Sequence, residues 1–263
     1  MLSADVFAQY HQAIGALASR GAEDITNTLR NAWRSAGGFT TQARQARVDT
    51  LHEMVREAAP IIAEQYGLAA GEVSAALWED IYWSDTGENM EALISGVDPD
   101  LYFGDAAETI VQARLADDDM DGVATALQGF ARAMILDYAR RTQIDNTRRV
   151  VRSRRRGHQN ARWMRVPTGD KTCAWCIMLA SRGPVYATQE TAGGDEFHGT
   201  DLDHFHAFCD CEIVSGFSSS AILEGYSHDE YKHMYEDARV YDSNGYVDLS
   251  GTLANMRKMY GFH

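Results

Sequence analysis

Apolar side chains recur at every third or fourth position over the first 155 residues of the chain, which is the spacing of amphipathic helices. The runs that carry this pattern are Val6, Tyr10, Ile14 and Leu17; Leu51, Met54, Val55, Ala58, Ile61 and Ile62; and Val123, Leu127, Phe130, Ala131, Met134, Ile135 and Tyr138. Residues that favour helix starts precede or divide these runs: Ser3, Asp24, Thr40 with Thr41, and Gly71 with Glu72. Because glycines stand mainly at such breaks, the pattern predicts a succession of helices, with new ones beginning near Asp24 and Gly71.

From about residue 156 the chain changes to short mixed segments rich in glycine, which hold all four cysteines and most of the histidines. Helical spacing returns over residues 228–239, after Ser227, and over residues 252–259, after Ser250, with an Asn244-Gly245 turn between them. We therefore predict a mainly α protein in two domains. Residues 1–156 form a helical domain that ends in an Arg-rich helix, and residues 157–263 form a small Cys/His-rich α+β domain with a helical tail.

Two local patterns have simple structural interpretations. Residues 117–122 read Asp-Asp-Asp-Met-Asp-Gly, like the first half of a calcium-binding loop, but position 12 of that loop is Gln128, which lacks the bidentate carboxylate. We interpret these acids as a helix N-terminus, where negative charge is favoured. Five aromatic residues are expected in the core or at helix junctions, with any exposed one able to dock on a partner: Trp78, Tyr82, Trp83, Tyr102 and Phe103.

Charge is distributed unevenly along the 263 residues. The net charge is −14, from 24 basic and 38 acidic side chains, yet residues 140–165 carry ten arginines against the single acid Asp145, a local charge of +9. No apolar run approaches the roughly 20 residues of a membrane span, and the first residues lack the pattern of a secretion leader, so we expect no membrane association.

This arginine block, the ten arginines within residues 140–165, predicts contact with something anionic. If the preceding helix continues, Arg141, Arg148, Arg152 and Arg155 fall near one face of it. That face could contact phosphates of DNA without reading its sequence, or acidic side chains of a partner protein or of this chain. The candidate nucleic-acid or partner-binding residues are Arg148, Arg149, Arg152, Arg154, Arg155 and Arg156.

The cysteines form the most informative pattern of the chain. Cys173 and Cys176 are a Cys-x-x-Cys pair, and His206, Cys209 and Cys211 follow after a long interval. Thiolates and imidazole are the ligands that zinc prefers in closed structural sites, so these five residues are candidate ligands of a structural Zn²⁺. Two alternatives stay open: disulfides or paired buried thiols, and a redox Cys-x-x-Cys motif.

The sequence around these cysteines resembles a known family. Residues 165–186, which contain Thr172-Cys173-Ala-Trp-Cys176, and residues 205–214, which contain His206-Ala-Phe-Cys209-Asp-Cys211, are similar to the phage Mu protein F-like minor head proteins, in the form found in phages of actinobacteria. The resemblance covers residues 164–214, and both cysteine elements match.

The resemblance implies a minor capsid protein of a tailed bacteriophage that is not an enzyme. Such a protein binds the portal vertex inside the head and acts in head assembly, with a role in DNA packaging or ejection also implied. Its partners would be the portal protein, the major capsid protein and packaged DNA bound without sequence preference, and it would pass through the host cytoplasm during assembly. The alternative from another class is a zinc-dependent nuclease, because His204 and His206 beside a Cys-x-x-Cys pair are faintly similar to ββα-metal enzymes.

Overall fold

The computed structural model describes residues 4–35, 41–116, 119–153, 161–167, 172–186, 211–217 and 226–262. Its elements are α1 (Ala4–Ser35), α2 (Thr41–Glu53), a π-helical turn η1 (Met54–Ala58), α3 (Ala59–Thr86), α4 (Asp100–Phe103), α5 (Asp105–Ala116), α6 (Met120–Arg152), β1 (Arg162–Val166), α7 (Ala174–Ala180), β2 (Glu212–Gly216), α8 (His228–Asp237) and α9 (Leu249–Tyr260). The prediction of a mainly α protein is confirmed. None of the helices in these ranges is both long and apolar enough to cross a bilayer.

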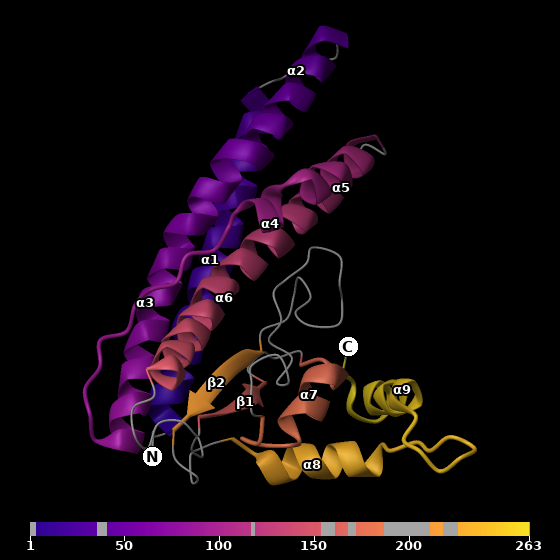
Figure 1. Cartoon of the computed structure of the whole chain (residues 1–263). Coiled ribbons are helices and arrows are strands. Elements are labelled where there is room, and N and C mark those ends of the chain that lie inside the picture. The colour runs from indigo at the N-terminus through magenta and orange to yellow at the C-terminus, as the bar shows by residue number, and fades with distance from the viewer. Residues whose placement is uncertain are drawn as a thin grey trace.

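Three long helices, α1, α3 and α6, pack side by side and hold the main hydrophobic core (Figure 1). The apolar runs of the sequence line this core, and Ile14, Leu127 and Ile135 are almost completely buried. Helix α6 begins where the acids predicted a helix N-terminus, because the Asp119 carboxylate accepts a hydrogen bond of 2.8 Å from the Gly122 backbone N–H.

The predicted helix starts at Asp24 and Gly71 are wrong, since α1 and α3 each run without a break through these positions. The glycines inside them make room for neighbouring side chains instead. A Cβ atom on Gly71 would stand 2.6 Å from the Ile94 side chain, and one on Gly67 would overlap the Tyr138 ring. A glycine that looks like a break in the sequence can therefore mark the closest approach of a neighbour.

An extended segment, residues 88–98, runs along α3 and α6 and is called the strap below. Figure 1 shows it leaving the end of α3 and turning back along the bundle to α4. The Asn146 side chain of α6 holds its backbone on two sides, accepting from Leu93 N–H at 2.9 Å and donating to Leu93 C=O at 2.8 Å. The Glu79 carboxylate of α3 accepts from Ala92 N–H at 2.8 Å. The strap thus gains from side chains the hydrogen bonds that a sheet would supply.

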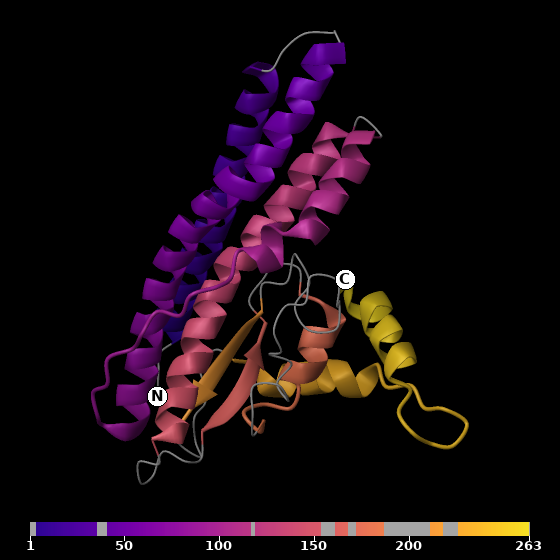
Figure 2. The same ribbon diagram turned by 45° about the horizontal axis from the view of Figure 1, so that its top comes forward.

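The small sheet lies against the bundle rather than apart from it (Figure 2). Strands β1 and β2 pair antiparallel, with Arg162 opposite Gly216 and Val166 opposite Glu212. Met164, Val214 and Phe217 belong to the same hydrophobic core as the long helices. Residues on both sides of the predicted boundary at 156/157, which itself lies outside the described residues, therefore share one core.

Residues 227–262 form a separate corner of the molecule. Helices α8 and α9 pack on α7 through Ile177, Ala238 and Met256. The predicted turn at Asn244-Gly245 is confirmed, with Gly245 in the left-handed region at φ 82°. The last helix begins earlier than predicted, at Leu249, because Asp248 caps it by accepting from Gly251 N–H at 3.0 Å.

Candidate thiol site and arginine block

The Cys-x-x-Cys pair forms the start of α7. Cys173 is the residue that caps this helix, and its sulfur accepts a hydrogen bond of 3.3 Å from the Cys176 backbone N–H. Both side chains are buried, Cys176 completely. A sulfur that accepts backbone hydrogen bonds is suited to carry the negative charge of a thiolate.

A buried arginine lies beside the second sulfur of the pair. Arg165 of β1 has no exposed surface, and its Nη2 lies 3.3 Å from the Cys176 Sγ. A guanidinium taken out of water needs negative or strongly polar neighbours. Arg165 therefore belongs to the thiol site and not to a protein surface.

Cys211 comes to the same place from β2, at the end of the sheet where β1 stops, because Val166 pairs with Glu212. It directly precedes β2 and is buried in one hydrophobic cluster with Cys173 and Cys176, together with Trp163 and Ile213. The structure thus brings three of the predicted ligands together, and we call Cys173, Cys176 and Cys211 the thiol cluster. His206 and Cys209 lie outside the described residues.

The thiol cluster by itself does not test the zinc prediction. Three cysteines converge, which is the donor chemistry of a structural zinc site, and a fourth ligand would have to come from residues 206 or 209. Within the ranges that the structure describes, no group of three His, Cys, Asp or Glu side chains is arranged to hold a metal ion. Zinc at this site stays a prediction.

The arginine block does not form one surface. Arg140 and Arg165 are buried, and Arg140 donates from Nε to the Cys211 carbonyl at 3.1 Å. Arg141 pairs with Asp137 at 3.3 Å and Arg148 with Asp145 at 3.7 Å. Two members of the block thus belong to the interior, and two others have carboxylates of this chain beside them.

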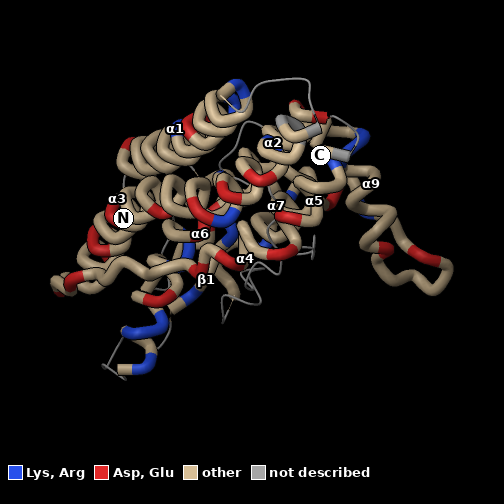
Figure 3. Tube along the Cα trace, turned by 90° about the horizontal axis from the view of Figure 1, so that it is seen from above, with Lys and Arg blue, Asp and Glu red and all other residues tan. Residues whose placement is uncertain are grey.

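Two further candidates, Arg149 and Arg152, lie in the last turn of α6. Arg149 reaches back to the strap and donates to the Glu91 carbonyl, and Arg152 is exposed. Figure 3 shows basic residues in blue where the described part of α6 stops. Arg154, Arg155 and Arg156 lie outside the described residues, so the stripe predicted along one helix face is traced only as far as Arg152.

Sequence reasoning missed a buried polar network between the bundle and β2. Asp137 of α6 accepts a 2.6 Å hydrogen bond from the Tyr102 hydroxyl. Burial, and then the nearby Asp137 carboxylate, raise the pKa of Tyr102. Burial, and then the charge of Glu212, raise the pKa of Tyr10 of α1. The sequence does contain a pattern that could have predicted this network. Over residues 137–147, polar side chains replace the apolar stripe of the preceding turns.

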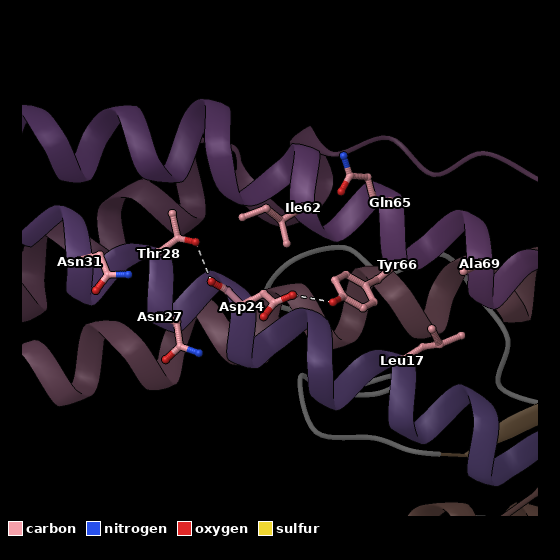
Figure 4. A pocket seen from close by; sticks show the side chains of 9 residues that line it. All are labelled: Leu17, Asp24, Asn27, Thr28, Asn31, Ile62, Gln65, Tyr66 and Ala69. Carbon is pink, nitrogen blue, oxygen red and sulfur yellow. Dashed lines mark hydrogen bonds between the residues drawn. The ribbon is translucent and has the colours of Figure 1, made fainter.

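A polar groove of about 480 Å³ opens between α1 and α3, away from any predicted site (Figure 4). At its centre the Asp24 carboxylate accepts a 2.5 Å hydrogen bond from the Tyr66 hydroxyl. The amides of Asn27, Asn31 and Gln65 line its sides. No residue type that the sequence analysis singled out for chemistry lies in this groove.

Most of the aromatic prediction is confirmed. Trp78, Tyr82, Tyr102 and Phe103 are buried, and the Trp78 and Tyr82 rings stack with centroids 5.1 Å apart. Trp83 differs, because its position on α3 turns the side chain outward and leaves it 58% exposed.

These features define a class of protein, a helical bundle with a small module on its side. The module is a two-stranded sheet with buried cysteines beside it, and it packs on the second half of α6, the longest helix, where the buried side chains are polar. The chain belongs to the VG15 protein family, whose pattern matches residues 3–238. It is similar to the Gene 15 protein of Mycobacterium phage D29, with 40% identity over a segment that covers 21% of this chain and 28% of that protein. It is also similar to the Gene 15 protein of Mycobacterium phage L5, with 38% identity over 21% of this chain and 29% of that protein.

These comparisons identify a bacteriophage protein. The aligned segments span less than a third of the length of either relative. No solved structure matches the chain.

Proposed function

We propose that this chain is a minor head protein of a tailed bacteriophage, bound at the portal vertex inside the capsid, where it acts in head assembly and has no enzymatic activity of its own. The observation that carries the proposal is the match to a phage protein family over residues 3–238. The resemblance of residues 164–214 to the Mu protein F-like minor head proteins supplies the particular role.

The arrangement of the cysteine motifs supports this role. Cys173 and Cys176 begin α7, and Cys211 begins β2, so the two matching elements meet in one buried cluster beside α6. A small module held together by buried side chains, on the side of a long helical bundle, suits a scaffold that positions two partners. The bundle would contact the portal protein, and the module would face the major capsid protein or the packaged DNA.

The arginines from Arg152 onward would provide the charged contact with these partners. Arg152 and the following Arg154, Arg155 and Arg156 form a dense positive charge on a protein of net charge −14. Phosphate contacts by these residues would weaken steeply with salt, by roughly 0.9 in log–log slope for each phosphate contacted. Contacts with acidic side chains of the portal would depend on salt more gently.

The decisive experiment is peptide mass spectrometry of purified virions of the phage that encodes this chain. We expect its peptides in the virion at few copies relative to the major capsid protein, with chemical cross-links to the portal protein. Absence from virions in which the portal is detected would overturn the proposal.

A second experiment tests the arginines and the enzymatic alternative. Changing Arg152, Arg154, Arg155 and Arg156 to Ala should reduce incorporation into heads, while Arg30→Ala, an exposed change on α1, should not. Incorporation at the normal level would show that these arginines have no role in assembly.

Plasmid cleavage by the pure protein with Mg²⁺ or Zn²⁺, lost in His206→Ala, would favour a nuclease instead.

A further inference from the structure

The groove between α1 and α3 contains a negative charge without an ionic partner (Figure 4). Asp24 is the one charged side chain among the nine residues that line it. No ion pair joins Asp24 to a basic side chain within the described residues. Arg20, one turn earlier on α1, is exposed and forms no hydrogen bond or ion pair with Asp24. A ligand in this groove would therefore meet a carboxylate that no described side chain neutralises by direct contact.

The Asp24 carboxylate is fixed before any ligand arrives. The Tyr66 hydroxyl donates a hydrogen bond of 2.5 Å to its Oδ2 atom. That hydrogen bond, followed by desolvation, raises the pKa of Tyr66, so the phenol keeps its proton and remains a donor. The Tyr66 ring lies close to α1 because Gly21 has no side chain, and a Cβ atom there would stand 3.0 Å from the ring. One carboxylate oxygen is thus occupied, and the other, Oδ1, is left for a ligand.

Beyond Asp24 the groove offers hydrogen-bonding amides. Asn27 and Asn31 follow Asp24 on α1 at intervals of about one turn, and Gln65 lies on the α3 side (Figure 4). The rise of an α-helix places Asn31 roughly 10 Å beyond Asp24 along the axis. None of these three amides has a hydrogen-bond partner in the part of the chain that the structure describes. Their oxygens can accept from a ligand, at a distance from the carboxylate that a flexible chain can span.

The rest of the wall is apolar. Ile62 of α3 points across the groove towards α1, and Leu17 and Ala69 lie at the end beside the Tyr66 ring (Figure 4). Leu17, Ile62 and Tyr66 are only partly buried against the main core, so each keeps accessible surface along the groove. Methylene groups that cover this wall would leave water together with it, which favours binding.

These features select the chemical class of the ligand. A guanidinium bonds best to both oxygens of a carboxylate at once, whereas an ammonium is a compact charge that needs only one. Because Tyr66 occupies one oxygen of Asp24, the site favours an ammonium. A Ca²⁺ or Mg²⁺ ion would need about six oxygen ligands, and the groove supplies a single carboxylate. The aliphatic wall further favours an organic cation, whose methylene chain can cover it.

We propose that the groove binds a primary alkylammonium. The ammonium would donate to Asp24 Oδ1, and the methylene chain would lie on Ile62. A second ammonium at the far end of a linear polyamine would donate to the amide oxygens of Asn27 and Asn31, so a polyamine should bind more tightly than a monoamine. A lysine side chain of a partner protein offers the same group. The inference stands independently of the proposed role in the phage head.

Isothermal titration calorimetry of the full-length protein with spermidine and with Nα-acetyl-lysine methylamide tests the site and separates the two sources. The solution contains about 150 mM NaCl, which screens diffuse attraction between polyamines and an acidic protein. We expect one spermidine to bind per chain. Tighter binding of spermidine assigns the site to a free polyamine, and tighter binding of the lysine derivative assigns it to a partner protein.

Two matched variants test the role of the carboxylate. Asp24→Asn should weaken binding at least about tenfold, which is the usual loss when a hydrogen bond to a charged group is removed. Glu23→Gln removes the same charge from an exposed residue that does not line the groove, and it should bind like wild type.

A third variant tests the choice between ammonium and guanidinium. In wild type the lysine derivative should bind more tightly than Nα-acetyl-arginine methylamide. Tyr66→Phe leaves both oxygens of Asp24 for the ligand, so the arginine derivative should gain affinity relative to the lysine derivative. Far-UV circular dichroism checks that all variants are folded.

Four outcomes would each overturn the proposal. They are the absence of saturable binding of either ammonium ligand to wild type, equal affinity of folded Asp24→Asn and Glu23→Gln, a wild type that prefers the arginine derivative, and an unchanged preference in folded Tyr66→Phe.

Discussion

The two halves of α6 are buried to a similar degree but by opposite chemistry. Residues 123–135 bury Val123, Leu127 and Met134 against the other long helices. Residues 137–147 bury Asp137, Arg140 and Gln143 among the last turns of α3, the strap and β2. A helix packed on helices can be apolar, because its neighbours satisfy their own backbone groups. A helix packed on an extended strap and short strands must supply polar partners for their exposed backbone.

This comparison predicts that the polar half is the less tolerant one. A buried apolar side chain can be shortened at the cost of a cavity, whereas removal of one member of a charged network leaves another charge buried without its partner.

The thiol cluster next to the polar half should show the largest effect if it holds zinc. We expect about one zinc per chain by native mass spectrometry, and Cys176→Ser should lose it and expose residues 161–262 to protease while the bundle stays resistant. The matched control is Ser243→Ala, an exposed substitution in the turn between α8 and α9. Wild type without metal but with its cysteines oxidised would favour disulfides.

Arg140→Met should lower the free energy of unfolding by about 3–5 kcal/mol, because it leaves Asp137 and the Cys211 carbonyl with fewer partners in the interior. Chemical denaturation measures the change. Arg148→Met, at an exposed ion pair on the same helix, should cost about 0–1 kcal/mol. Equal costs for the two substitutions would mean that the polar half is no more demanding than the surface.

Acid should destabilise the protein through His11. Burial beside Phe7 and Tyr10 lowers the pKa of this histidine from 6.5 to about 4, so the folded state binds its proton less readily than the unfolded state. Above pH 6.5 this histidine is neutral in the folded and the unfolded state alike. The free energy of unfolding falls as the pH drops from 6.5 towards 4, by roughly 3 kcal/mol at pH 4. Plotted against pH, the denaturation midpoint of wild type should change more steeply over this range than that of His11→Gln. Parallel curves would contradict the assignment of this pH dependence to His11.

Asn146→Ala should release the strap at a cost of about 1–3 kcal/mol, since the Leu93 backbone loses both hydrogen bonds to one side chain. Limited proteolysis should then cut within residues 88–98. Asn89→Ala, an exposed substitution within the strap itself, should leave the cleavage pattern unchanged. Cleavage in neither variant would show that packing alone holds the strap.

Much of the helical architecture could be predicted from particular residues. The apolar spacing of residues 123–138 predicted α6, and the acids before them predicted a helix N-terminus within residues 117–122, where Asp119 caps the helix. The cysteine spacing made Cys173, Cys176 and Cys211 candidate ligands of one site; all three lie in one buried cluster, and their role as zinc ligands stays a prediction. The errors at Gly71 and at Asp24 share one cause, which is that local propensity does not report the neighbour across a helix interface.

The arginine block shows the same limit at the candidate site. Ten arginines in 26 residues are a compositional fact, and from this fact alone it follows that the segment needs negative or polar partners. Which arginines face inward depends on packing: β2 and the cysteine module pack on one side of α6, so Arg140 and Arg165 find carbonyl and sulfur acceptors in the interior while Arg152 stays in solvent. A charge is set by residue type, but its burial is set by what the fold brings beside it: Cys211, just before β2, for Arg140, and Cys176 of α7 for Arg165.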